Sequence, residues 1–110
     1  MEVYFKTKKL SKLVSDASKR KRAFGELISI AILKRIDDLR AATTLKDMEY
    51  LPGKCHELKG SRKGQFALNL NANLRIVFEP NHDPIPKNEN GGIDWEQVKS
   101  ILIIEIIDYH

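Results

Sequence analysis

The sequence predicts an α+β fold in which an N-terminal strand and two helices pack on one face of a small, mainly antiparallel, twisted sheet. Apolar residues recur every three or four positions in the first half of the chain and every second position after Lys54. These are the periods of helices and strands. Helices followed by consecutive strands are typical of α+β proteins. A chain of 110 residues has material for one hydrophobic core, so we expect a single domain over residues 1–110.

The first forty residues contain the expected strand and helices. Val3 and Phe5 alternate along a short strand, and the apolar spacing of residues 10–17 predicts a short helix. The basic run "KRKR" at residues 19–22 either ends this helix or links it to the next. The main core helix is predicted from apolar side chains at intervals of three and four: Phe24, Leu27, Ile28, Ala31, Ile32, Ile36 and Leu39.

The second half of the chain has the pattern of strands. Two alternating segments, residues 66–70 and 74–78, flank Asn-Ala-Asn and predict a hairpin. Residues 81–99 are rich in proline, glycine and amides, which predicts a long connection. The last run, "SILIIEIIDYH", is apolar on both faces apart from Glu105. We therefore expect its strand to lie inside the sheet.

Composition and charge restrict the class of protein. Hydrophobic residues make up 42% and charged residues 31%, and no stretch approaches the roughly 20 apolar residues of a membrane span. The start has no apolar signal-peptide region, and the single cysteine, Cys55, cannot form an internal disulfide. We expect a soluble cytoplasmic protein that does not associate with membranes.

The charge is unevenly distributed. Residues 1–64 hold 16 Lys and Arg against 8 acids, and residues 65–110 hold 3 against 7, so the halves carry +8 and −4. A basic first half suits a polyanion such as nucleic acid, or an acidic protein partner. Taken on its own, the charge distribution is better explained by a solvated basic helix face.

The sheet half also carries a concentrated set of polar groups with chemical uses. In the strand "LRIVFE", Arg75 lies opposite the apolar face, so it faces the side of the sheet that the helices leave open. Strict alternation places His56 and Lys59 on opposite faces of the sheet, and it places Tyr109 on the face opposite Asp108 and His110. Both segments must therefore turn out of their strands to form one site. The set is His56, Lys59, Arg62, Lys63, Arg75, Asp108, Tyr109 and His110.

The segment "HELKGSRKGQFALNLNANLRIVF", followed by a terminal "DYH", resembles the HigB branch of the RelE superfamily. These are bacterial toxins of type II toxin–antitoxin pairs that cleave messenger RNA on the ribosome. The resemblance covers Lys54 to Phe78 and the last residues, while the helical half aligns only by pattern. It implies a RelE-like fold and an endoribonuclease active site made of His56, Lys59, Arg75, Asp108, Tyr109 and His110. The charged turn adds Arg62 and Lys63 as RNA-binding candidates.

Metal-independent RNA cleavage explains why such residue types would be needed. The 2′-hydroxyl attacks the adjacent phosphorus, so the site must accept a proton, stabilise phosphoryl charge and protonate the leaving oxygen. Lys59 and Arg75 suit the phosphate. His56 and His110 suit proton transfer, with Asp108 as base or tautomer-setting partner. Tyr109 suits base stacking. Base and acid are not assigned individually.

Each residue also has a purely structural explanation. His56 could bond to backbone, Arg75 could pair with Glu79, and the terminus could be solvated. Taken together, in the order of the toxin family, the residues favour catalysis. We expect no cofactor and no metal, because Cys55 and His56 are adjacent and point apart, and His82 has no suitably spaced partner.

The resemblance implies a set of partners and leaves two alternatives. The partners are the ribosome, mRNA and a HigA-like helix-turn-helix antitoxin, with operator DNA contacted only through that antitoxin. The first alternative is a ParE-like toxin that inhibits DNA gyrase and needs no nuclease residues. The second is a degenerate toxin retained as an antitoxin-binding and repression module.

Overall fold

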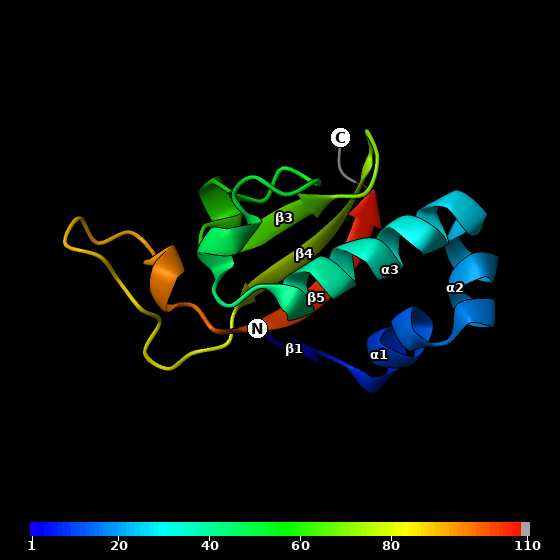
Figure 1. Ribbon diagram of the computed structural model, residues 1–110, viewed down its shortest axis with the longest axis horizontal. Coiled ribbons are helices and arrows are strands. Elements are labelled where there is room, and N and C mark those ends of the chain that lie inside the picture. Colours follow the sequence, from blue (N-terminus) through cyan, green and yellow to red (C-terminus); the bar gives the residue numbers. More distant parts are fainter. Residues whose placement is uncertain (109–110) are drawn as a thin grey trace.

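A computed structural model describes residues 1–108 and places five strands in one sheet (Figure 1). The spatial order is β1-β5-β4-β3-β2. β1 pairs in parallel with β5, and all other neighbours are antiparallel. The strands are β1 (Glu2–Phe5), β2 (His56–Glu57), β3 (Phe66–Asn69), β4 (Leu74–Pro80) and β5 (Ser100–Asp108). The α+β class and the interior position of the last strand are confirmed.

Three α-helices follow β1 and precede the other four strands, where the sequence predicted two helices. They are α1 (Lys8–Ser15), α2 (Ala17–Phe24) and α3 (Glu26–Ala41), and α3 lies across one face of the sheet (Figure 1). The extra helix contains the basic run at residues 19–22, which was expected to end a helix or link two. No helix within residues 1–108 has the length and apolar content needed to cross a membrane.

Asp16 divides the predicted first helix in two. Its backbone is extended (φ −90°, ψ 112°), which ends α1, and its carboxylate accepts a hydrogen bond from Lys19 N at 3.1 Å, which begins α2. Aspartate competes well for such N-cap positions. The Lys19 amide is the largest cause of a pKa of Asp16 below its ordinary value. The spacing of apolar residues does not predict this break between α1 and α2, because the helical spacing continues on both sides of Asp16.

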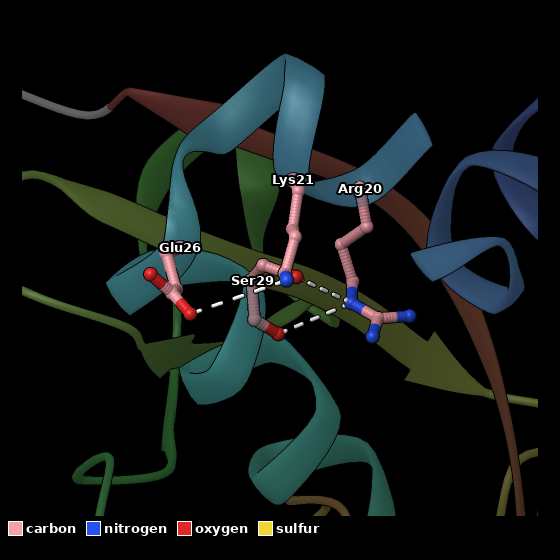
Figure 2. A network of polar contacts seen from close by, with 4 residues as sticks. All are labelled: Arg20, Lys21, Glu26 and Ser29. Atoms are coloured by element: carbon pink, nitrogen blue, oxygen red, sulfur yellow. Dashed lines mark hydrogen bonds and ion pairs between the residues drawn. The ribbon is translucent and has the colours of Figure 1, made fainter. Parts of the chain in front are cut away.

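Arg20 joins the three helices. In Figure 2 its guanidinium extends from α2 toward Ser29 on α3, and Nε donates to Ser29 Oγ at 2.8 Å and Ser29 O at 3.2 Å. Its Nη1 donates to the carbonyl oxygen of Val14 on α1. Lys21 and Glu26 form a longer, exposed ion pair of 4.0 Å across the same turn. Because Arg20 is buried, these acceptors replace the water that its charge would otherwise keep.

The core lies between the helices and the sheet. The buried side chains of α3 are Ser29, Ile32, Ile36 and Leu39. The three apolar ones form one core cluster with Phe66, Leu68, Ile76 and Phe78 of the sheet. Leu27, which the sequence assigned to the same apolar face, is 83% exposed. At 3.6 residues per turn it lies roughly 160° from the centre of the buried stripe, so the prediction for Leu27 was wrong.

The predicted hairpin of β3 and β4 is present in the structure. Phe66 stands opposite Phe78, and their rings stack with centroids 5.6 Å apart. Trp95 packs edge-on against Phe66 at 5.2 Å. The side chain of Asn71 accepts hydrogen bonds from Asn73 N and Leu74 N at 2.8 and 2.7 Å, so asparagine closes the turn as its turn preference suggested.

A β-bulge in β5 changes which residues face the helices. Val77 is opposite Glu105 whereas Phe78 is opposite Ile103, so Ile104 is an extra residue in the ladder. Without the bulge, positions 103 and 105 would share a face. With it, Ile103 stays in the core and Glu105 turns to the other side, as expected for a carboxylate in an otherwise apolar strand.

The long connection, residues 81–99, folds at the end of the sheet away from Asp108. β4 enters it at Pro80, which is opposite Ile101, while Leu74 at the other end of β4 is opposite Asp108. It forms the yellow and orange segment that projects from the sheet in Figure 1. Its ends are held by hydrogen bonds from Asn81 N to Ser100 O (2.8 Å) and from Lys99 N to His82 Nε2 (3.0 Å).

Candidate functional site

The face of the sheet opposite the helices, here called the open face, presents two rows of side chains. Directly opposed residues in an antiparallel sheet point to the same side. One row runs His56, Ala67, Val77, Glu105, and the other runs Asn69, Arg75, Ile107. Arg75 is therefore on the open face, as its strand position predicted.

A short turn covers part of the open face. The 3₁₀ turn at Gly60–Arg62 directs Arg62 to Glu105, with Nη2 and Oε1 2.6 Å apart, and Arg62 Nη1 donates to Gln65 Oε1 at 2.9 Å. Leu58, Ala67 and Val77 form a small buried cluster on this face. Arg62, expected to bind RNA, thus already has two acceptors in the folded chain.

The row of Arg75 contains a polar residue that the sequence analysis did not single out. Asn69 is directly opposite Arg75 on β3, and within residues 1–108 its buried Oδ1 accepts no hydrogen bond. A buried acceptor of this kind is uncommon in native proteins. Asn69 alternates with Leu68 and Leu70, so its placement on the polar side of the strand was the available signal.

His56 is held by the backbone immediately before it. Its Nδ1 lies 2.7 Å from Lys54 O. Since a carbonyl oxygen only accepts, Nδ1 carries the proton, and Nε2 of the neutral ring keeps its lone pair. Lys54 adopts a left-handed conformation (φ 49°) after Gly53 (φ 105°). A side chain at Gly53 would meet Leu68 Cδ1 at 2.6 Å, so glycine is required for this approach to β2.

The two lysines of the charged turn lie outside the ladder. β2 ends at Glu57, and Lys59 is an exposed residue that precedes the Gly60–Arg62 turn. The chain therefore leaves the strand before Lys59, which is what a shared site with His56 requires. Lys63 lines a separate groove of about 300 Å³ together with Glu57, Lys87 and the backbone of Gly91 and Gly92.

Asp108 is the last residue of β5 and is exposed. It is opposite Leu74, one position beyond the Arg75–Ile107 pair, so strand alternation directs it away from the face that Arg75 occupies. Tyr109 and His110, also expected in the site, lie outside the described residues.

The open face brings His56 and Arg75 to the same side of the sheet without joining them. They are separated by two strand spacings and two residues along the strand, which is about 12 Å between Cα atoms from ordinary sheet dimensions. Both can act on one phosphodiester only by converging on it from either side.

Among residues 1–108, no three His, Cys, Asp or Glu side chains gather in a way that would hold a metal ion.

Comparisons with known proteins establish the fold. No protein-family profile matches the sequence, and no curated protein sequence matches it. A YoeB/ParE toxin from Agrobacterium tumefaciens superposes with a TM-score of 0.59 at 13% identity, over 100% of both chains. The toxin structures "YoeB-YefM complex" and "YoeB dimer" from Staphylococcus aureus give TM-scores of 0.56 at 14% and 15% identity, covering 100% of this chain and 97% of each of those. The chain thus has the fold of YoeB-like toxins.

Proposed function

We propose that this protein is the toxin of a type II toxin–antitoxin pair and acts as a ribosome-dependent mRNA endonuclease. The observation that carries the proposal is the open face, where a toxin-like fold presents Arg75 on the same side of the sheet as a histidine, His56, whose ring is fixed by Lys54 O. The segment that resembles the HigB branch, Lys54 to Phe78, supplies most of this face. The proposal therefore includes membership of the RelE/ParE superfamily, in its HigB branch, and a cytoplasmic site of action.

The proposed reaction is an attack of the 2′-oxygen on the adjacent phosphorus. The O2′–P bond forms and the P–O5′ bond breaks, which leaves a 2′,3′-cyclic phosphate and a 5′-hydroxyl. Arg75 stabilises the charge on the phosphoryl oxygens, for which a guanidinium offers two parallel N–H donors. His56 Nε2 is an acceptor for the 2′-hydroxyl proton, and His110, the other candidate for proton transfer, would give a proton to the leaving 5′-oxygen. Lys59 and the terminal Asp108, Tyr109 and His110 complete the proposed site, which requires the chain end to turn out of the alternation of β5 so that Asp108 reaches the face of Arg75.

The proposed partners follow from the same assignment. The similar structures include a heterotetrameric YoeB–YefM toxin–antitoxin complex from S. aureus, so we expect this chain also to bind a cognate antitoxin. We propose that this antitoxin is a HigA-like helix-turn-helix protein, and that operator DNA is contacted only through it. The ribosome and its bound message are the proposed targets.

The function is tested by adding the purified protein to ribosomes that hold a defined codon in the A site. Wild-type protein should cut the message only on the ribosome, and the upstream fragment should end in a 2′,3′-cyclic phosphate. The variant His56→Ala should cut more slowly, whereas His82→Ala, which alters a histidine in the distant loop, should cut at the wild-type rate.

The same preparation can be tested against DNA gyrase. An intact message together with loss of supercoiling would contradict the nuclease assignment and favour a ParE-like toxin. An intact message, unaffected gyrase and tight binding to an antitoxin would instead favour a repression module without catalysis.

A further inference from the structure

Asn69 and Arg75 are directly opposed near the turn of the β3–β4 hairpin (Figure 1). One position closer to the turn, Leu70 N donates to Leu74 O at 2.9 Å, which makes that position a hydrogen-bonded pair of the ladder. Hydrogen-bonded and non-hydrogen-bonded pairs alternate in an antiparallel ladder, and side chains lie closest at the non-hydrogen-bonded pairs. Asn69 and Arg75 form such a pair, so their side chains lie within reach of each other on the open face.

The main chain of Asn69 connects this pair to the segment that carries His56. Asn69 N donates to Gly53 O at 2.7 Å. The carbonyl oxygen of Lys54, the next residue, accepts from His56 Nδ1, also at 2.7 Å. Asn69 therefore joins the backbone that fixes the His56 ring to the strand opposite Arg75. Because the main chain makes this connection, a substitution of the Asn69 side chain leaves it in place.

The side chain of Asn69 carries a buried acceptor without a donor. Within residues 1–108, Oδ1 accepts no hydrogen bond, and such a buried carbonyl oxygen destabilises a folded protein. Of the two residues directly opposite Arg75, Ile107 has no polar side-chain atom, so Asn69 is the one that can bond to the guanidinium. A guanidinium has five N–H donors. Arg75 can therefore donate to this oxygen and to a phosphate at the same time.

We propose that Asn69 is a positioning residue for Arg75. When Arg75 engages a phosphate on the open face, one of its N–H groups donates to Asn69 Oδ1, and the bond holds the remaining donors on the phosphoryl oxygens. Asn69 acts through the guanidinium and does not read the RNA, because its Oδ1 is buried. This inference rests on the proposed function, in which Arg75 is the group that stabilises the phosphate.

The test uses two substitutions of Asn69 in the full-length protein. Asn69→Leu removes the acceptor and keeps a side chain of similar size. Asn69→Asp keeps an oxygen at the position of Oδ1. Asn90→Leu, an exposed change in the long connection, is the matched control, and circular dichroism establishes that each variant is folded.

Single-turnover cleavage on programmed ribosomes separates positioning from a purely structural role. Asn69→Leu should lower the rate at saturating protein concentration about tenfold, as expected for one lost hydrogen bond to a charged group. The half-saturating concentration should not change. Asn69→Asp should recover part of the lost rate, and Asn90→Leu should cut at the wild-type rate.

A double-mutant cycle with Arg75→Met tests whether Asn69 acts through the guanidinium. Once Arg75 has been replaced, Asn69→Leu should not lower the rate further, because the group that it positions is absent. Losses that multiply in the double variant would overturn the proposal, since Asn69 would then act independently. A changed codon preference in Asn69→Leu would also overturn it, because Asn69 would then contact the message.

A second readout does not depend on cleavage. In ¹⁵N-labelled protein, the guanidinium N–H signals of Arg75, identified by their loss in Arg75→Met, report exchange with water. A short 2′-O-methyl RNA oligonucleotide has phosphates but no nucleophile. Its addition should slow this exchange in the wild type and in Asn69→Asp, and much less in Asn69→Leu. No slowing in the wild type, or equal slowing in Asn69→Leu, would refute the positioning role.

The two readouts distinguish a failure of this inference from a failure of the proposed function. If the wild type cuts no message but the oligonucleotide slows exchange at Arg75 only when Asn69 or Asp is present, the positioning role stands and the nuclease assignment fails. If the wild type cuts the message and Asn69→Leu cuts it equally fast, the nuclease assignment stands and the positioning role fails.

Discussion

The ion pair between Arg62 and Glu105 ties the charged turn to the last strand, and its removal has a predictable cost. The Nη2–Oε1 distance is 2.6 Å, and the two side chains are 31% and 35% exposed. Arg62 also donates to Gln65. The perturbation is a double-mutant cycle of Arg62→Met and Glu105→Met, which removes each charge while keeping side chains of similar length.

The expected coupling free energy is about 1 kcal/mol. Exposed ion pairs couple by roughly 0.2–1 kcal/mol, because water and salt screen them. Charge-assisted bonds with good geometry and partial burial lie at or above the top of that range. The partial exposure of Arg62 and Glu105 argues against a larger figure. Each single variant should therefore lower the free energy of unfolding, and the double variant should cost about 1 kcal/mol less than the sum.

Urea unfolding of the four proteins measures this coupling. The exposed pair Lys46–Glu49, with a similar distance of 2.7 Å, is the matched control and should show a smaller, more salt-sensitive coupling. The pairing also predicts that Arg62→Met affects mRNA cleavage much less than loss of Arg75, since Arg62 is already engaged. Additive effects on stability, or a loss of cleavage as large as that at Arg75, would refute this role for Arg62.

Three further outcomes follow from other parts of the chain. Arg20→Met should lower the free energy of unfolding by about 3 kcal/mol in urea titrations, because buried acceptors including Ser29 Oγ lose a charged donor. Trp95→Ala should cost about 3 kcal/mol by the same assay, because it removes the ring packed on Phe66. Burial raises the pKa of Cys55 to about 12, so iodoacetamide should alkylate this thiol only after unfolding. Ionisation of Cys55 in the unfolded chain should lower the free energy of unfolding as the pH rises from about 9. The wild type should therefore lose more stability between pH 7 and pH 10 than Cys55→Ala does, and an equal loss in the two proteins would contradict this.

Much of the fold could be predicted because its elements have strong, unambiguous periods. The hairpin of β3 and β4 combines two alternating apolar runs with asparagine turn chemistry, so both strands and the turn between them follow from residues 66–78. The single break at Asp16 could not be read from apolar spacing, because an N-cap side chain overrides a period that continues past it. Leu27 was misplaced because intervals of three and four drift around a helix over several turns.

The candidate site was predictable to the extent that strand alternation decides it. Arg75 faces away from the helices because its neighbours Leu74 and Ile76 face them, and no long-range information is needed. The pairing of Arg62 with Glu105 could not be predicted, because it depends on the bulge at Ile104. Alternation with Leu68 and Leu70 was enough to place Asn69 on the face of Arg75, but its position directly opposite Arg75 depends on the cross-strand register, which the sequence does not specify.

The central claim is that Arg75 on the open face stabilises the phosphate during mRNA cleavage. The most direct measurement is the single-turnover rate of message cleavage on programmed ribosomes by Arg75→Met, with Arg40→Met, an exposed change on α3, as control. The account predicts a rate about 10²–10³-fold lower for Arg75→Met and an unchanged rate for Arg40→Met, with both variants folded by circular dichroism. Cleavage at the wild-type rate by folded Arg75→Met would contradict it.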